Sequence, residues 1–210
     1  IYPGFPASEV LFDDKGAVAG IATGDLGIGK SGAPREDYTR GMELRAKYTV
    51  FGEGARGNLT KGLIQRFSLN RHSDHFKYGL GVKELWQLAP GKFEPGLVRL
   101  YHFDDNLLSV GFVTHLNYEN PTLSPFEEFQ RFKTHPLIAE TFEGAKRIGY
   151  GARAIMEGGW QSVPKLVFPG GCLVGCSAGF VNVPRIKGSH NAVLSGMQAA
   201  DAIADALKAG

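Results

Sequence analysis

Hydrophobic and polar positions alternate at strand spacing in the first quarter of the chain and then change to helical spacing. Residues 7–24, "ASEVLFDDKGAVAGIATG", hold two strand-like runs around the turn "DDKG", which predicts a β-hairpin. The glycine-rich excursion "DLGIGKSGAPRED" follows, and an apolar strand is expected at residues 48–51. Leu59, Leu63 and Ile64 then recur at helical spacing, so this strand should lead directly into a helix.

The middle of the chain has a different character. The runs "YGLGVKELWQL", "GLVRLYHF" and "LLSVGFVTHLNY" are strand-like, with turn residues between them, and predict an antiparallel arrangement. The segment "SPFEEFQRFKTHP" predicts a helix, with Ser124 as N-cap, Glu127 three residues later and Pro125 in the first turn. Its three phenylalanines share a helical register, which is more typical of a core than of a cofactor site.

The last third is expected to return to short strands through "IGYGARAIMEGGWQSVPKLVFPGG" and to end in a helix over residues 189–207. The apolar residues of this helix recur in steps of four and three, which predicts one buried face. That stripe consists of Val193, Met197, Ala200, Ala204 and Leu207.

Taken together, the pattern predicts an α/β layer made from the two ends of the chain, with a β-rich insertion between them. We expect three segments, at residues 1–63, 64–144 and 145–210. The 210 residues, 43% hydrophobic and 21% charged, are typical of a globular protein. A net charge of +2 gives no indication of a nucleic-acid partner, and no apolar run is long enough to cross a bilayer. Because the first residue is Ile1 and not methionine, we expect an excerpt from a longer chain.

Two cysteines, Cys172 and Cys176, lie four residues apart on "CLVGC". A metal site would need a second pair or two histidines at ligand spacing, and the sequence has neither. On one strand their side chains would lie too far apart for a comfortable disulfide bond. We therefore expect two buried, reduced thiols.

The first candidate site is the glycine-rich turn between the strand at 48–51 and the helix after it. Gly52, Gly54 and Gly57 follow the G-x-G-x-x-G spacing, and the turn comes after a strand as that motif requires. Glycines let a backbone approach a ligand closely, and the N–H groups at a helix start favour anions. A glycine-rich turn without a ligand explains the spacing equally well.

The second candidate site is the long connection "GCSAGFVNVPRIKGSHNA" at residues 175–192, where two to six residues are usual. Ser189 can cap the final helix, whose N-terminus carries a partial positive charge. Arg185, Lys187 and His190 crowd that positive end, where cations are unfavourable, and a bound anion would relieve the conflict. The arrangement suits a group that becomes negative during reaction, such as the N1–C2=O edge of a reduced flavin. A capped helix after an irregular loop is the alternative explanation, and it accounts for Ser189 only.

Four further residues fit the flavin hypothesis. Gly175 and Gly179 would let the chain lie against a pyrophosphate or ribityl group, and Gly188 would allow close approach. Asn182 offers both a donor and an acceptor to a ring edge.

These stretches carry a family resemblance. "LVGCSAGFVNVPRIKGSHNAVLSG", "GIATGDLGIGKSGAP", "NPTLSPFEEFQRFKTHP" and "AKRIGYGARAIMEGGWQSVPKLVFPGG" resemble the electron transfer flavoprotein–ubiquinone oxidoreductase family in order and spacing over nearly the whole chain. The "NVPRIKGSH" element is specific to that family, and related flavoproteins such as geranylgeranyl reductases have a different loop there. The implied fold class is α/β (α+β): part of a glutathione-reductase-type FAD-binding domain with an inserted antiparallel-sheet quinone-binding domain.

The resemblance also implies an activity and a location. It implies an FAD enzyme that takes electrons from reduced electron transfer flavoprotein and passes them to ubiquinone, without a general acid or a nucleophile of its own. The family's 4Fe-4S cluster, its N-terminal dinucleotide-binding segment and its membrane-embedding segments would all lie outside this chain, which has no cysteine set for a cluster. Such a protein is membrane-associated, on the matrix side of the mitochondrial inner membrane or the cytoplasmic side of the bacterial inner membrane.

Individual residues are assigned by the same resemblance. One FAD contact region matches Gly52, Glu53, Gly54, Arg56 and Gly57. Another matches Gly175, Gly179, Asn182, Lys187, Gly188, Ser189 and His190. The quinone candidates in the β-rich insertion are Tyr78, His102 and Phe112. For Phe112, as for Trp86, core packing is the favoured alternative, and structural placement of Tyr78 and His102 is equally compatible with the sequence.

The chain departs from the family where Val98 runs directly into Arg99, because the family has a longer hairpin there, beside the quinone. A deletion would put quinone binding in doubt. Since both flanking strands match, we expect omitted residues and not a deletion.

Two other function classes stay open. One is a different FAD-dependent reductase or monooxygenase acting on a lipid-like substrate. The other is a cofactor-free fragment that serves only as a fold or interaction module. Without the N-terminal dinucleotide-binding strand, we expect the isolated 210 residues to retain no FAD and to be inactive.

Overall fold

The computed structural model describes residues 1–91, 100–103 and 105–209. They form two compact units, one made of residues 1–76 with 156–210 and the other of residues 77–155. These junctions fall later than the boundaries expected near residues 63 and 144, and each unit is described by itself. The junction between Val98 and Arg99, where we expect omitted residues, lies outside the described residues.

The first unit begins with the predicted hairpin. Strands β1 (Ala7–Phe12) and β2 (Val18–Thr23) pair antiparallel, and β5 (Glu43–Arg45) adds to the other edge of β2. The turn is held by Asp13, whose Oδ1 accepts the backbone N–H groups of residues 15 and 17 at 2.9 and 2.8 Å. The hairpin prediction is confirmed.

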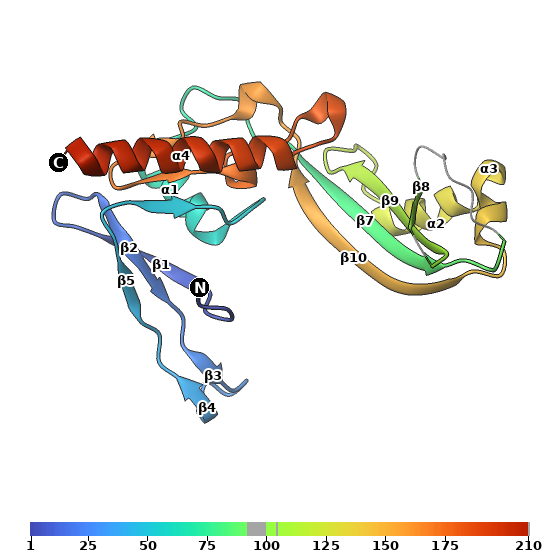
Figure 1. Ribbon diagram of the computed structural model, residues 1–210, viewed down its shortest axis with the longest axis horizontal. Coiled ribbons are helices and arrows are strands. Elements are labelled where there is room, and N and C mark those ends of the chain that lie inside the picture. Colours follow the sequence, from blue (N-terminus) through green and yellow to red (C-terminus); the bar gives the residue numbers. More distant parts are fainter. Residues whose placement is uncertain (92–99, 104, 210) are drawn as a thin grey trace. The chain divides into compact units, whose positions relative to one another are not determined.

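The glycine-rich excursion is more regular than the sequence indicated. It forms an antiparallel pair of strands, β3 (Leu26–Ile28) and β4 (Pro34–Thr39), which extends away from β1 and β2 (Figure 1). Gly27 has φ +70°, and a Cβ there would lie 2.7 Å from the backbone of Asp37. The strands can therefore come this close only because residue 27 is glycine.

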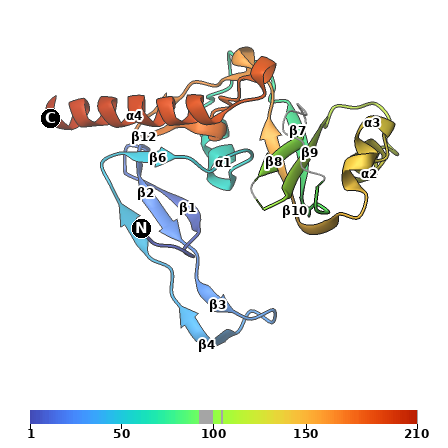
Figure 2. The same cartoon turned by 45° about the vertical axis from the view of Figure 1, so that its right-hand side comes forward.

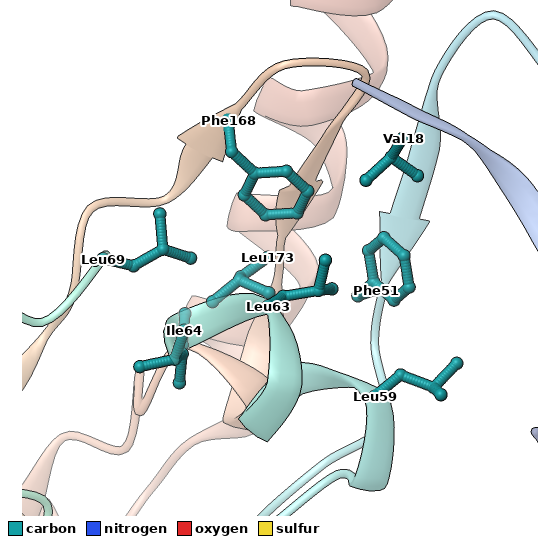
Figure 3. Packing of buried hydrophobic residues seen from close by; sticks show 9 residues of the cluster. Val18, Phe51, Leu59, Leu63, Ile64, Leu69, Phe168 and Leu173 are labelled. Carbon is teal, nitrogen blue, oxygen red and sulfur yellow. The ribbon is translucent and has the colours of Figure 1, made fainter. Parts of the chain in front are cut away.

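A short parallel pair lies at the centre of this unit. Strand β6 (Thr49–Phe51) runs parallel to β12 (Gly171–Leu173), which also pairs antiparallel with β11 (Val167–Phe168). Helix α1 (Asn58–Arg66) follows β6 as predicted. The core packs between them (Figure 3), and its buried members are Val18, Phe51, Leu59, Leu63, Ile64, Leu69, Phe168, Leu173 and Ala178.

Helix α4 (Ser189–Ala209) forms where expected, but the prediction of its buried face is wrong. No residue of α4 is buried, and Val193 and Met197 of the predicted stripe are 62% and 58% exposed. The face turned towards β12 carries mostly small side chains, Ser195, Ala199, Ala202 and Ala206 beside the larger Ile203, and these line a cavity of about 420 Å³. Small residues let a helix axis approach a sheet closely, and a periodicity count based on larger apolar side chains does not detect them.

The strand prediction for "CLVGC" is also corrected. Strand β12 ends at Leu173, and Cys176 lies in the 3₁₀ helix η3 (Gly175–Ser177), so the two cysteines do not share a strand. Both are free thiols. Cys172 is buried, and this burial raises its pKa, whereas Cys176 is only partly buried.

The second unit is an antiparallel sheet with helices beside it. Its strand order is β10–β7–β9–β8, with β7 (Tyr78–Gln87), β8 (Leu100–Phe103), β9 (Leu107–His115) and β10 (Lys146–Met156), the last residue of β10 belonging to the first unit. Strand β10 is longer than the short strands that we expected.

Figure 2 shows two helices of this unit beside the sheet, α2 (Pro125–Lys133) and α3 (Pro136–Ala139). The 3₁₀ helix η1 (Glu140–Phe142) follows α3 along the chain. The predicted cap is confirmed, since Ser124 Oγ accepts the N–H of Glu127 at 3.4 Å. Phe129 of α2 is fully buried against the sheet, while Phe126 is exposed. No helix within the described residues is long and apolar enough to cross a membrane.

Candidate functional site

The turn after β6 is organised by Glu53. Its carboxylate accepts the N–H of Leu59 at 3.2 Å, the N–H of Thr60 at 2.7 Å and the hydroxyl of Thr60 at 2.6 Å. Helix α1 has Gly57 at its N-cap, which has no side chain to cap it, so Glu53 satisfies the free N–H groups instead. A Cβ on Gly57 would lie 2.4 Å from Glu53 Cβ. The glycine is therefore needed to admit the capping carboxylate.

The rest of this turn leaves its outer side open. Gly54 has φ +80°, and nothing lies within 4 Å of a Cβ built on it. Arg56 also has a positive φ, of 58°. Gly52 has only Val174 near its Cβ position, at 3.5 Å. The Cα side of Gly54 is thus open, and the assignment of this turn to a cofactor contact region stays a prediction.

The long connection before α4 folds back on itself. The backbone N–H of Asn182 donates to the carbonyl of Lys187 at 2.7 Å, and that of Lys187 donates in return at 3.2 Å. Asn182 Oδ1 accepts the N–H of Arg185 and caps the 3₁₀ helix η4 (Val183–Arg185). The side-chain oxygen that we expected at a ring edge is therefore already in use.

The start of α4 differs by one residue from the prediction. The carbonyl of Gly188 accepts the N–H of Ala192 at 2.9 Å, so Gly188 is the N-cap and Ser189 the first helical residue. Asn191 Nδ2 donates to the carbonyl of Phe180 at 3.0 Å and ties the helix to the loop. Lys187 and His190 are both exposed near this helix start.

The two glycine turns meet at one edge. Strands β6 and β12 are parallel, and ligands of α/β folds bind beyond the carboxyl ends of such strands. The N–H of Gly54 donates to Ser177 Oγ at 3.0 Å, and the N–H of Gly175 donates to Ser195 Oγ at 3.0 Å. Gly175 and Gly179 have φ of +60° and +80°. The structure therefore brings the two predicted regions together.

A cavity of about 560 Å³ extends along the second of these regions. It is lined by residues of the 157–163 segment, by residues 179–184 and by Asn191. Trp160, in the 3₁₀ helix η2 (Trp160–Ser162), is 84% exposed at this cavity. Sequence reasoning missed the segment, although an aromatic residue after the pair Gly158–Gly159 could have drawn attention to it.

The three quinone candidates do not converge. Tyr78 is the first residue of β7. His102 pairs with Leu108 of β9, and Leu108 pairs with Trp86 of β7, so His102 lies level with Trp86 in the sheet. Eight residues of extended strand separate Tyr78 from Trp86, roughly 27 Å. Phe112 stacks with Phe129 of α2, at 6.2 Å between ring centroids.

All three candidates lie on the sheet face that α2 covers. Val82 of this face belongs to the core cluster that includes Phe129, and Tyr78 lies four residues before it on the same strand. Residues alternate between faces along a strand, so Tyr78 shares the face of Val82, and His102 shares that of Leu108. For Phe112, the core packing that the sequence favoured is what the structure shows. Trp86 also packs against this cluster.

The opposite face is hollowed by glycines. Gly81 and Gly111 are diagonal neighbours there, since Gly81 pairs with Val113 and Lys83 with Gly111. A cavity of about 700 Å³ is lined by these residues and by others of β7, β9 and β10. This unit thus has an open, largely apolar surface on the face away from α2.

A buried carboxylate joins α2 to the sheet. Glu84 is 1% exposed, and its oxygens accept from Lys133 Nζ at 2.6 Å, Trp86 Nε1 at 2.9 Å and Arg147 at 3.2 Å. Burial alone would raise the pKa of Glu84, but the hydrogen bonds from Lys133, Trp86 and Arg147 outweigh it and hold the pKa below its ordinary value. Sequence reasoning did not find Glu84, because the residue occupies an ordinary position in an alternating strand.

Metal ligation is not supported within the described residues, where no three His, Cys, Asp or Glu side chains are placed to hold an ion.

Comparison with solved structures defines the class of fold. A geranylgeranyl bacteriochlorophyll reductase-like protein from Thermoplasma acidophilum superposes with a TM-score of 0.69 at 18% identity, over 97% of this chain and 49% of that one. A flavin-dependent brominase gives 0.63 at 15% identity, over 98% of this chain and 51% of that one. A flavoprotein/dehydrogenase from Cytophaga hutchinsonii gives 0.59, also at 15% identity, over 98% and 49%. The mixed α/β fold, with its antiparallel sheets, is therefore one shared with flavin-dependent oxidoreductases.

Comparison of sequences shows which proteins the chain is similar to. The family described as "ETF-QO, ubiquinone-binding" matches residues 98–155. Electron transfer flavoprotein-ubiquinone oxidoreductases from Caenorhabditis elegans and Pseudomonas aeruginosa are 53% and 52% identical, over 97% and 100% of this chain. The human mitochondrial protein is 50% identical over 99% of this chain. The predicted resemblance to the electron transfer flavoprotein–ubiquinone oxidoreductases, an oxidoreductase class, is confirmed.

The chain spans only part of these relatives: 37% of the C. elegans protein, 41% of the P. aeruginosa protein and 36% of the human protein. The alignment with the P. aeruginosa protein covers 227 positions, more than the 210 residues here. That relative therefore carries residues that have no counterpart in this chain.

Proposed function

We propose that this chain forms the flavin-holding and quinone-binding part of an electron transfer flavoprotein–ubiquinone oxidoreductase. The observation that carries the proposal is the meeting of the Gly54 turn and the 175–179 loop at the carboxyl ends of the parallel strands β6 and β12. The names of the relatives supply the reaction, and this geometry supplies a place for the cofactor.

The residues at this edge fit FAD. The open side of Gly54 lets the backbone approach a pyrophosphate or ribityl chain, and the 560 Å³ cavity is within the size range of cofactor sites. FAD would supply reversible two-electron chemistry, and the side chains would supply binding and electrostatics. The parallel strand pair also supports the assignment of residues 1–76 and 156–210 to a glutathione-reductase-type domain.

The start of α4 has a specific task in this proposal. Its N–H groups and the nearby charge of Lys187 would stabilise negative charge on a bound ring, because both present positive potential to it. Gly188 brings the backbone close, and His190 adds a further donor. No proton-transferring or nucleophilic side chain is required.

For the quinone we propose the glycine-hollowed face of the sheet in residues 77–155. Support comes from the 700 Å³ cavity and from the ubiquinone-binding family, whose match covers most of this sheet. Phe112, Tyr78 and His102 lie on the other face, and we assign them to packing. The ring of the quinone would lie over Gly81 and Gly111, where no side chain projects.

The remaining assignments concern the whole protein. We propose electron transfer flavoprotein as the electron donor, ubiquinone as the acceptor, and a 4Fe-4S cluster and membrane attachment through segments outside these 210 residues. The inner mitochondrial or bacterial membrane is the location that this activity requires.

The test is to purify the full-length protein, measure its FAD content and assay ubiquinone reduction with reduced electron transfer flavoprotein. We expect one FAD per chain, and a Gly81→Val variant that keeps the FAD but loses quinone reduction. A wild-type protein without flavin would refute the proposal.

A second candidate is a flavin-dependent reductase with a lipid-like substrate, which the TM-score of 0.69 to the reductase-like protein favours. Rapid flavin reduction by a nicotinamide cofactor, with none by electron transfer flavoprotein, would favour it. A cofactor-free fragment is the third candidate, and retention of FAD by the isolated 210 residues through gel filtration would exclude it.

A further inference from the structure

We propose that Ser177 is a positioning residue for the cofactor, because it fixes the Gly54 turn against the 175–179 loop. The proposal rests on the proposed function, in which both turns contact FAD. Ser177 itself need not touch the cofactor.

The contact is buried and long-range. Ser177 is 1% exposed, and its Oγ accepts the N–H of Gly54 at 3.0 Å, across 123 residues of sequence. Strand pairing brings β6 and β12 together only as far as Phe51, whose carbonyl accepts the N–H of Val174 at 3.1 Å. Ser177 continues the connection beyond the strands, where the chains turn.

A second serine extends this connection to the helix. Ser195 Oγ accepts the N–H of Gly175 at 3.0 Å and donates to the carbonyl of Ala192 at 2.8 Å. The Gly54 turn, the 3₁₀ helix η3 and the first turns of α4 are therefore linked in series by two hydroxyl groups. All three are segments that the proposed function places against the same ligand.

The bond from Ser177 constrains the direction of Gly54. A glycine at φ +80° has few steric limits, so its amide orientation depends on the acceptor that it finds. With the N–H directed at Ser177, the open side of Gly54 is held facing outward. Binding sites depend on such support, because a shift of about 1 Å in a contact region weakens binding strongly.

The alternative is that Ser177 only accepts a hydrogen bond from a buried amide, so that it contributes to the stability of the fold and not to FAD binding. A matched variant separates the two roles. Thr23 is also buried, and its Oγ1 accepts the N–H of Met42 at 3.0 Å, across 19 residues and within the β2–β5 region. Thr23→Val and Ser177→Ala thus each remove one buried hydroxyl acceptor of a backbone amide.

The experiment uses full-length protein from which FAD has been removed, and measures the FAD dissociation constant and the melting temperature of the apoprotein. We expect both variants to lower the melting temperature, but only Ser177→Ala to raise the dissociation constant, by about tenfold. Ser177→Cys, which keeps the volume and a weak acceptor, should give an intermediate value and guards against a folding defect in the alanine variant. Equal dissociation constants for Ser177→Ala and Thr23→Val would overturn the proposal.

A measurement on the apoprotein, without FAD, distinguishes a failure of the role proposed for Ser177 from a failure of the proposed function. If the wild-type protein binds no FAD, the proposed function fails, and hydrogen exchange of the apoprotein then decides the role of Ser177. Faster exchange in residues 52–57 of Ser177→Ala than of Thr23→Val would support the positioning of the turn. Unchanged exchange there would overturn it.

Discussion

In each unit a glutamate fixes a helix to the neighbouring chain, and the two glutamates lie in different surroundings. Glu53 belongs to the turn after β6, and Glu84 lies within β7. Glu53 is exposed and accepts two backbone N–H groups and the Thr60 hydroxyl at the start of α1. Glu84 is buried and is matched by Lys133 and Arg147. The motif around Glu53 pointed to a cofactor contact, yet its carboxylate is occupied by the helix. Glu84 belongs to no sequence motif, yet its carboxylate forms ion pairs with two cationic side chains, Lys133 and Arg147.

The largest effect is expected from Glu84→Gln. The change removes the negative charge and leaves Lys133, which is 11% exposed, without its counter-charge. Breaking a buried pair from one side costs about 3–5 kcal/mol of unfolding free energy. Urea unfolding, followed by far-ultraviolet circular dichroism, measures this loss.

A matched control is Glu128→Gln, which removes an ion pair with Arg131 on the solvent side of the same helix. It should cost less than about 1 kcal/mol, because exposed pairs contribute little. Equal losses for the two variants would show that Glu84 is not the buried anchor of α2.

The second prediction concerns pH. Since the pKa of Glu84 in the folded state lies below its unfolded value, its contribution is complete above the ordinary glutamate pKa of about 4.3 and is lost as the pH falls through the lower folded value. Hydrogen exchange of the α2 and β7 amides should show loss of protection as the pH falls below the ordinary glutamate pKa of about 4.3. Glu84→Gln should remove that part of the pH dependence, and an unchanged profile would contradict this account.

The third prediction concerns the Gly54 turn. Gly54→Ala meets no atoms within 4 Å, so its cost is the backbone strain of an L-residue at φ +80°, about 1–2 kcal/mol. The added methyl group would project into the open side and weaken FAD binding by more than this loss of stability explains. Calorimetric titration of the apoprotein with FAD measures the binding, and unchanged affinity would place the cofactor elsewhere.

The smallest effect is expected from Glu53→Ala. Loss of a helix-capping group costs about 1 kcal/mol of unfolding free energy. Because the Glu53 carboxylate is exposed, its removal leaves no buried cation without a counter-charge. FAD affinity should then follow the stability loss only, because the carboxylate faces α1. A much larger fall in affinity than in stability would restore the direct cofactor contact that the family resemblance implied for Glu53.

The sequence predicted those features that neighbouring residues determine. The β1–β2 hairpin, the β6–α1 connection and the Ser124 cap each depend on a few consecutive residues, and all three formed as expected. The buried face of α4 was predicted wrongly, because most residues on the face turned towards β12 are small, while Val193, Met197 and Leu207 of the predicted stripe are exposed.

The candidate site shows the same division. Its glycines were found from their spacing, whereas the bond between Ser177 and Gly54 joins residues 123 positions apart and leaves no local pattern. The glycine-hollowed sheet face was missed for a related reason. Aromatic and polar residues attracted the quinone assignment, while Gly81 and Gly111 form a surface only when β7 and β9 pair in their observed register.

The most direct test of the central claim is hydrogen–deuterium exchange of the full-length apoprotein with and without added FAD. We expect FAD to slow exchange in both residues 52–57 and residues 175–190, because we propose that the two turns contact the same ligand. Binding of FAD that leaves either segment unprotected would contradict it.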